Sequence, residues 1–298
     1  MTFGDSSRRI PLYVLDVTEP DAWASTLDAA ENDPENVPVG QLRSKHTVLT
    51  DSLHAALKYR DEDVRRLLRT YDDIVRTENT VAGQPGPHEQ DRVSPLLYYV
   101  SEGEAGTNPN AYTFRVHWPA DLMEEMLTTK GLRRSWGMWH ELGHLHQQAV
   151  WEWEQTTEVT VNVYSLAVQR MFGEPSRLEQ EGHLDKARAF LERPDGERDF
   201  ADLAEEPCTM LVMFEQLRMA FGDEFYATLH RLAREERTVP DDEGARKRFL
   251  MVVASRAAHT DLIGFFERWG FTVDERTRSK VARLKLPRPA RDVAALGL

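Results

Sequence analysis

The chain has 298 residues, 41% of them hydrophobic, and a formal net charge of −13 at pH 7. This length allows one large domain or two modest ones, each with an adequate core. The acidic balance argues against a nucleic-acid or anionic-membrane surface, because both select for basic patches. Cys208 is the only cysteine, which excludes an internal disulfide and, on cysteine count, a cysteine-based zinc site. No apolar run is long enough to cross a bilayer, so membrane insertion is not expected.

The first 130 residues have the pattern of short strands separated by helices and loops. Apolar and β-branched runs predict strands over residues 10–15, 47–49, 93–100 and 111–118. Apolar residues at helical spacing, and a short amphipathic stretch, predict helices over residues 61–78 and 121–128. The strand over residues 47–49 ends at Thr50, Asp51 and Ser52, whose side chains can cap a following helix.

A His-Glu-x-x-His motif occupies residues 140–144, within a helix predicted over residues 134–150. Residues four apart share a helix face, so His140 and His144 can offer two imidazole nitrogens to one zinc ion. Glu141 then lies beside the metal and can take a proton from the attacking water. Flanking tryptophans indicate that this helix is buried, where His and Glu need partners. A zinc ion is the simplest partner, and a catalytic zinc site requires a third protein ligand.

The third ligand is predicted to come from a second helix, over residues 156–170. Glu158 lies on that helix, far enough after His144 for the chain to reverse and for the two helices to pack together. Glu152 and Glu154 are the rival ligands, but they flank tryptophans in the expected connecting loop. We therefore expect Glu158 to complete the site.

Three further residues are candidates for supporting roles. Asn162 lies one turn beyond Glu158 and can accept a hydrogen bond from His140, which would fix the tautomer of that ligand. The alternative for Asn162 is a solvated or capping amide. Tyr112 and Tyr164 are candidate donors to the oxyanion of the transition state, on chemistry alone.

His146 does not fit a three-histidine site. A metzincin requires glycine at position 147 and histidine at position 150, where this chain has Gln147 and Val150. We therefore expect His146 to be a packing or surface histidine.

The C-terminal third is predicted to be helical, with helices over residues 207–221, 223–237, 245–258 and 261–269. Apolar residues of the first of these, including Met210 and Phe214, have the spacing of a core face rather than a binding surface. Strands before the zinc helix and helices after it indicate an α+β fold. We expect an α+β part over residues 1–150 and a helical part over residues 151–298, forming one catalytic unit.

The segments that carry the metal motifs resemble a known family. Residues 135–147 resemble the zinc-helix signature of the enhancin-like metallopeptidases, gluzincins that include viral enhancins and bacterial mucin-degrading enzymes. Residues 158–166 resemble the third-ligand helix of that family, and the likeness extends weakly over residues 40–285. The resemblance implies a gluzincin-like α+β fold and an HExxH…E zinc endopeptidase with four site residues: ligands His140, His144 and Glu158, and the base Glu141.

The expected reaction is zinc-dependent hydrolysis of peptide bonds in proteins, with O-glycosylated mucin-like proteins as candidate substrates. An extended substrate would add to an edge strand, which we place over residues 111–118. One alternative is an intracellular zinc hydrolase that acts on a small peptide or amide. Another is a relative without catalysis that binds glycoprotein, although such a relative has no need for Glu141.

The compartment depends on whether the chain is complete. The first twelve residues contain Arg8 and Arg9 but no apolar segment typical of a signal peptide. The sequence therefore predicts a cytoplasmic protein if the chain is complete. The family resemblance implies instead a secreted protein, seen here as a mature form or an excised catalytic domain.

Overall fold

The computed structural model describes residues 10–33, 35, 37–236 and 239–298. The chain divides into two compact units. Unit 1 comprises residues 1–76 and 94–145, and unit 2 comprises residues 77–93 and 146–298. The division after Leu145 lies close to the boundary expected near residue 150, but unit 2 also takes the segment 77–93. Arg8 and Arg9, on which the expectation about a signal peptide depends, lie outside the described residues.

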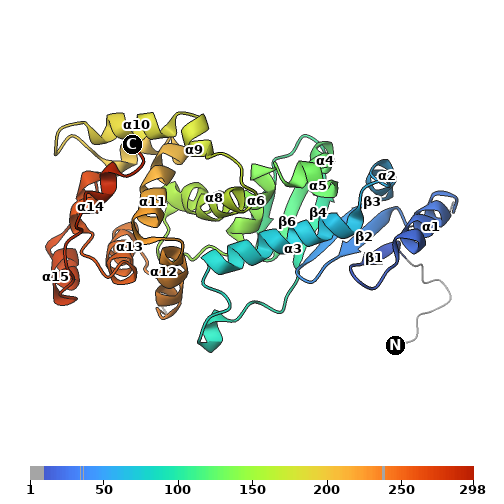
Figure 1. Ribbon diagram of the computed structural model, residues 1–298, viewed down its shortest axis with the longest axis horizontal. Helices are drawn as coiled ribbons and strands as arrows, with labels where there is room; N and C mark the ends of the chain where they lie inside the picture. The colour runs from blue at the N-terminus through green and yellow to red at the C-terminus, as the bar shows by residue number, and fades with distance from the viewer. Residues whose placement is uncertain (1–9, 34, 36, 237–238) are drawn as a thin grey trace. The chain divides into compact units, whose positions relative to one another are not determined.

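Unit 1 contains, within its described residues, a mixed six-stranded sheet with the strand order β1-β2-β3-β4-β6-β5. Strands β1, β2, β3, β4 and β6 are labelled in Figure 1. The strands are β1 (Leu12–Val14), β2 (Val39–Arg43), β3 (Thr47–Ser52), β4 (Tyr98–Gly103), β5 (Asn110–Tyr112) and β6 (Arg115–Pro119). Strands β2 and β3 pair antiparallel, as do β5 and β6, and the other neighbours are parallel. Leu49, Val100 and Val116 on three adjacent strands are fully buried and form the centre of the core of this unit.

Helices precede and follow the strands of unit 1. They are α1 (Pro20–Glu31), α2 (Leu53–Lys58), α4 (Met123–Leu127), α5 (Thr129–Leu132) and α6 (Trp136–His144), while α3 (Val64–Val81) runs from unit 1 into unit 2. Ser52 caps α2 as expected, because its hydroxyl accepts a hydrogen bond from the Ala55 N–H at 3.2 Å. The Tyr71 hydroxyl donates to the Met126 carbonyl at 2.9 Å, which joins α3 to α4.

The edge of the sheet corrects the prediction of a single strand over residues 111–118. The chain reverses at Thr113 and Phe114, so that β5 and β6 form a hairpin in which Tyr112 pairs with Arg115. Thr113 has a φ of 58°, which lies in the left-handed region that tight hairpin turns use. Polar and apolar residues alternate through the turn, and this pattern conceals the reversal. The edge strand is therefore β5, and β6 lies inside the sheet.

Unit 2 is helical in the part of the chain that the structure describes. Its helices are α7 (Thr157–Thr160), α8 (Asn162–Met171), α9 (Arg177–Gln180), α10 (His183–Leu191), α11 (Pro207–Phe221), α12 (Glu224–Arg234), α13 (Glu243–Ala257), α14 (Ile263–Arg268) and α15 (Glu275–Arg283). Helix α11 is central to this core: Met210, Phe214 and Leu217 are fully buried, as their spacing predicts. The fold is therefore α+β, as expected.

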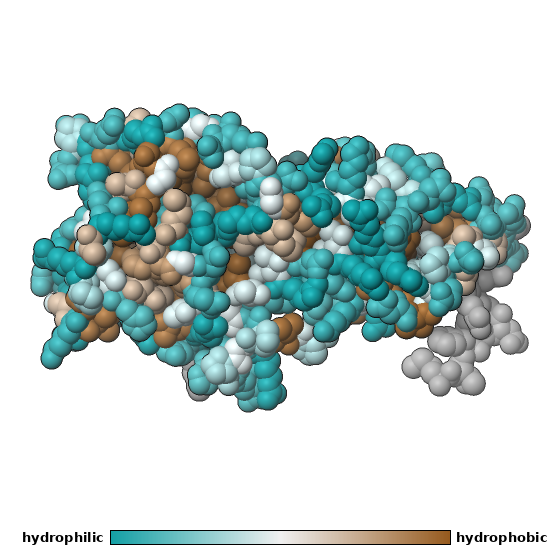
Figure 2. Space-filling model, in the orientation of Figure 1, coloured by the Kyte–Doolittle hydropathy of each residue, from teal (hydrophilic) through white to brown (hydrophobic). Residues whose placement is uncertain are grey.

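The described surface is mostly polar on the face that Figure 2 shows. Smaller hydrophobic areas lie between the polar ones. Among residues 10–298, apart from the four internal positions that are not described, no helix combines the length and apolar character needed to cross a membrane.

Candidate active site

Helix α6 carries the HExxH motif, and side chains near its N-terminus hold it in place. Ser135 is the N-cap: its Oγ accepts a hydrogen bond from the Met138 N–H at 3.1 Å and donates one to the Glu125 carboxylate. The first bond satisfies one of the N–H groups left free at the start of a helix. The Trp139 Nε1–H donates to the Leu132 carbonyl at 2.9 Å. These contacts fix the rotation of α6 before the motif begins.

Gly137 allows α6 to pack closely against the sheet of unit 1. A Cβ atom at this position would lie 3.1 Å from Cη2 of Trp118 on β6, which is tighter than ordinary van der Waals contact. Trp118 is 1% exposed, and its Nε1–H donates to the Leu122 carbonyl at 2.9 Å. The motif helix thus rests on a fixed aromatic side chain.

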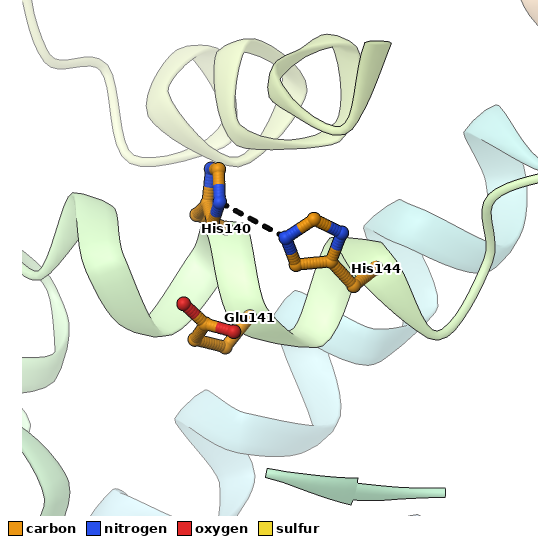
Figure 3. Close-up of side chains that lie close together, drawn as sticks. All are labelled: His140, Glu141 and His144. Atoms are coloured by element: carbon orange, nitrogen blue, oxygen red, sulfur yellow. Dashed lines mark hydrogen bonds between the residues drawn. The ribbon is translucent and has the colours of Figure 1, made fainter. Parts of the chain in front are cut away.

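The two motif histidines point toward one another on one side of α6 (Figure 3). Their Nε2 atoms lie 3.1 Å apart, and their ring planes are nearly perpendicular, at 89°. Two nitrogens bound to one tetrahedral zinc at about 2.0–2.1 Å lie about 3.3 Å from each other. The separation found for His140 and His144 is close to this value, so the two side chains fit a shared metal ion.

Glu141 lies on the adjacent side of the same helical turn (Figure 3). It is 7% exposed. Its carboxylate belongs to a group with His140 and His144 in which the potential ligand atoms lie within 4.8 Å of one another. The structure therefore brings together the two predicted ligands and the predicted base.

Helix α6 ends at His144, although the sequence predicts that it continues to residue 150. The Leu145 N–H bonds to the Leu142 carbonyl, three residues back, at 3.1 Å, which tightens and closes the last turn. His146 then leaves the helix and is 7% exposed. Its Nε2 lies 3.2 Å from Asn79 Oδ1, and its Nδ1 lies 3.6 Å from the buried Glu78 carboxylate. His146 is a packing histidine, one of the two roles expected for it.

The expected helix over residues 156–170 forms as α7 and α8. Glu158, the predicted third ligand, lies in the first turn of α7 and is exposed. The Asn162 side chain donates to the Glu158 carbonyl at 2.8 Å and accepts from the Ser165 hydroxyl at 3.1 Å. The first bond joins α8 to α7, and the second lies within α8. The role of Glu158 as a ligand and the contact of Asn162 with His140 stay predictions.

Gln147 has a role that the sequence interpretation missed. Its Nε2 donates to the Thr157 carbonyl at 2.7 Å and to Thr160 Oγ1 at 2.8 Å. Both acceptors belong to α7, on either side of Glu158. The residue that excludes a three-histidine site therefore holds the helix that carries the predicted third ligand. The signal that could have indicated this role is an amide side chain three residues after the end of the motif helix.

The two candidate oxyanion donors lie in very different surroundings. Tyr112 is on edge strand β5 and is 77% exposed. Tyr164 is 1% exposed, and its hydroxyl donates to the His146 carbonyl at 3.0 Å. The same hydroxyl is 3.0 Å from Nε2 of His230. Burial lowers the pKa of His230 to about 3, so this histidine is neutral. The phenol proton of Tyr164 is thus already used in the core of unit 2.

The mixed sheet, the motif helix packed on it and the convergent histidines define the chain as having the architecture of a metallopeptidase catalytic domain. The chain belongs to the family described as Peptidase M60, enhancin and enhancin-like, whose sequence model matches residues 6–270. The family expected from the motif segments is confirmed.

Two relatives are similar to this chain over most of its length. The chain is 27% identical over 286 residues to TRPM8 channel-associated factor 2 from Bos taurus, covering 92% of this chain and 29% of that protein. It is 30% identical, with a TM-score of 0.85, to a conserved Bacillus anthracis protein of unknown function, covering 95% of this chain and 58% of that one. The chain thus spans less than a third of the first relative and little more than half of the second.

Solved catalytic domains share the fold at lower identity. ZmpB metallopeptidase from Clostridium perfringens has a TM-score of 0.85 and 17% identity, covering 98% of this chain and 58% of that one. The M60 catalytic domain of ZmpC from Clostridium perfringens was solved in complex with the sialyl T antigen. It has a TM-score of 0.82 and 16% identity, and the match covers 97% of this chain and 58% of that one.

Proposed function

We propose that this protein is a zinc-dependent metallopeptidase that hydrolyses peptide bonds, with Glu141 as the general base. The observation that carries the proposal is the 3.1 Å approach of the His140 and His144 Nε2 atoms, with a buried carboxylate beside them. Two neutral imidazoles cannot both present lone pairs at this distance without a proton or a cation between them. Membership of a metallopeptidase family supports the cation.

Glu158 is the proposed third ligand. Its helix, α7, is held by Gln147 on one side, through Thr157 and Thr160, and by Asn162 on the other. Metal ligands are usually oriented by such partners, whose loss weakens the site. A carboxylate supported in this way suits zinc, which accepts a mixed set of nitrogen and oxygen donors.

The chemistry of the proposal divides between the metal and the chain. Zinc, when bound, would polarise the scissile carbonyl and make the attacking water more acidic. Glu141 removes the proton of this water and returns it to the leaving amine. For the oxyanion we propose Tyr112, because the Tyr164 hydroxyl already donates its proton to the His146 carbonyl.

Strand β5 is the proposed docking strand for an extended substrate. It packs beside α6 and lies at the edge of the sheet of unit 1. In a hairpin with a two-residue loop, the pair next to the loop, Tyr112 and Arg115, exchanges hydrogen bonds, so the next pair does not. The N–H and C=O of Ala111 therefore point to the open edge, where a substrate strand can bond to them.

Glycoproteins are the proposed substrates, and the support is a relative of the same fold that was solved with the sialyl T antigen. A small peptide or amide is the alternative substrate. Size selectivity separates the two, since a hydrolase for small substrates would cleave di- and tripeptides and leave folded glycoproteins intact.

A binding role without catalysis is the second candidate function. It is favoured by the name of the mammalian relative, which describes association with the TRPM8 channel. The complete HExxH motif favours the peptidase, because binding alone gives no use to a buried base beside two convergent histidines.

The experiment that tests the proposal incubates the protein with mucin, casein and a peptide library, with and without a chelator, and identifies products by mass spectrometry. We expect new peptide termini that disappear with the chelator and return when zinc is added. Binding of glycoprotein with no cleavage of any substrate by the zinc-loaded protein would overturn the peptidase proposal.

A further inference from the structure

A second group of metal-ligand side chains lies in unit 2, far along the chain from the HExxH motif. Glu181, His183 and Cys208 each offer one ligand atom, and these atoms lie within 4.8 Å of one another. Ligand atoms around one tetrahedral zinc are about 3.3–3.7 Å apart. Side-chain rotations that move the ligand atoms by about 1 Å would therefore bring the three onto one ion. A carboxylate, an imidazole and a thiolate together favour a borderline-soft divalent cation.

We propose that Glu181, His183 and Cys208 form a second site for a thiophilic divalent cation such as Zn²⁺, which joins the α9–α10 junction to the start of α11. The site is independent of the proposed peptidase activity. It leaves a fourth position for water, because a closed structural zinc site uses four protein ligands.

The backbone of the α9–α10 junction brings two of the ligands to the same side. Gly182 separates Glu181 from His183 and has a φ of 75°, a left-handed conformation that glycine adopts without strain. As a result, Glu181 Oε2 lies 3.3 Å from His183 Nε2. A carboxylate and an imidazole nitrogen at this distance share either a proton or a cation.

A partner on the far side of the ring orients His183. Its Nδ1 lies 3.2 Å from Oγ1 of Thr209, which is fully buried. Nδ1–H can donate to this hydroxyl, which leaves the Nε2 lone pair directed toward Glu181. This arrangement is typical of metal-binding histidines, whose second ring nitrogen donates to a neighbouring oxygen.

Basic side chains near the group are already paired, which leaves the ligand atoms available. Arg177 bonds to Oε1 of Glu181 at 2.9 Å, so that Oε2 is the oxygen that faces His183. Lys186 bonds to both carboxylate oxygens of Glu206, at 2.7 and 2.8 Å. The positive charges that would repel a cation are thus balanced by carboxylates.

Cys208 supplies the soft ligand from the first turn of α11. It is half-buried, and burial raises the pKa of its thiol. A metal ion must displace the thiol proton, so binding releases a proton and strengthens as pH rises. A bound metal ion would therefore hold Cys208 as a thiolate ligand.

The uniqueness of Cys208 makes the test specific, because the HExxH site has no thiol. With Co²⁺ as the probe, the protein should show a thiolate-to-cobalt charge-transfer band, and the double variant His140→Ala/His144→Ala should retain this band. Cys208→Ser should abolish the band, and His183→Ala should remove most of it. With Zn²⁺ as the probe, alkylation of Cys208 should slow by about tenfold or more, since only the free thiolate reacts.

Glu181→Gln provides the variant least able to disturb folding, because the side chain is exposed. It should weaken zinc protection of Cys208, while Glu179→Gln, an exposed neighbour on α9, should leave protection unchanged. The proposal is overturned if the wild-type protein shows neither band nor protection. It is also overturned if His183→Ala and Glu181→Gln protect Cys208 as well as the wild type, which would mean that the thiol binds metal alone.

Discussion

His140 and His144 direct their Nε2 atoms at each other across 3.1 Å, one helical turn apart on α6. The approach brings two electron-rich nitrogens together in a partly buried place, and such an arrangement is stable only when a proton or a cation lies between them. The proposed zinc site rests on this geometry, because a shared metal ion would take the place of that proton.

Replacing Glu141 should separate metal binding from catalysis. Glu141→Gln keeps the size of the side chain but removes the base, so we expect kcat to fall by roughly 10²- to 10⁴-fold. Zinc content, measured by elemental analysis, should stay at the wild-type level. A variant that cleaves at the wild-type rate would rule out Glu141 as the base.

Replacing Glu158 should weaken zinc binding. Loss of an outer-shell partner already costs about 10–100-fold in metal affinity, so loss of a ligand in Glu158→Ala should exceed about 100-fold. Zinc affinity is measured by competition with a chromogenic chelator. Glu152→Ala and Glu154→Ala are the matched controls, because both are rival carboxylates on the same segment. If either control loses zinc while Glu158→Ala keeps it, the ligand assignment moves to that residue.

Gln147 should matter through the position of α7. Gln147→Leu removes the bonds to Thr157 and Thr160 while preserving bulk, so we expect zinc affinity to fall by about tenfold. Gln148→Leu is the control, since the Gln148 side chain donates to the His230 carbonyl and not to α7. Equal zinc affinity in the two variants would contradict a positioning role for Gln147.

The edge strand offers a test of substrate docking. Ala111→Pro removes the N–H that faces the open edge and leaves the pairing of β5 with β6 intact, because edge positions tolerate proline. One lost hydrogen bond should lower kcat/KM for extended peptides about 2- to 10-fold, mainly through KM. Ala111→Val keeps the N–H and should behave as the wild type. Unchanged KM in the proline variant would exclude docking at this position.

Asp51 should make stability depend on pH. It is 2% exposed, and burial, followed by the charge of Glu102, raises its pKa from 3.8 to about 8. Between these values the folded protein holds a proton that the unfolded chain has lost, so stability falls as pH rises through this window. Asp51→Asn cannot ionise and should therefore melt above the wild type at about pH 8, with a difference that shrinks toward about pH 4.

Thermal unfolding followed across this pH range checks the prediction for Asp51. The exposed Asp61 provides the control, because Asp61→Asn should leave the pH dependence of Tm as in the wild type. Parallel Tm curves for wild type and Asp51→Asn would show that Asp51 ionises normally in the folded protein.

The sequence was most informative where chemistry depends on local geometry. Two histidines four residues apart share a face on any α-helix, so the convergence of His140 and His144 follows from their spacing. The same reasoning predicts the buried face of α11, with Met210 and Phe214. The capping role of Ser52 is equally local, since a cap binds N–H groups two or three residues ahead.

The sequence was less informative where one residue changes the direction of the chain. Alternation of polar and apolar residues continues through Thr113, so the pattern predicts one strand, whereas the positive φ of Thr113 turns the chain into a hairpin. Helix α6 likewise ends at His144 because His146 is drawn into contacts with Asn79 and Glu78, which lie far away along the chain.

By itself, then, the sequence determined the family, the α+β class and the chemistry of the motif helix, because each depends on short-range pattern. Tertiary structure alone decided which side chains from distant segments meet. A single cysteine appeared to exclude a thiolate ligand for zinc, yet the packing of α10 on α11 places Cys208 beside His183 and Glu181. Contacts of this kind depend on how helices pack, and the spacing of residues within one segment does not predict them.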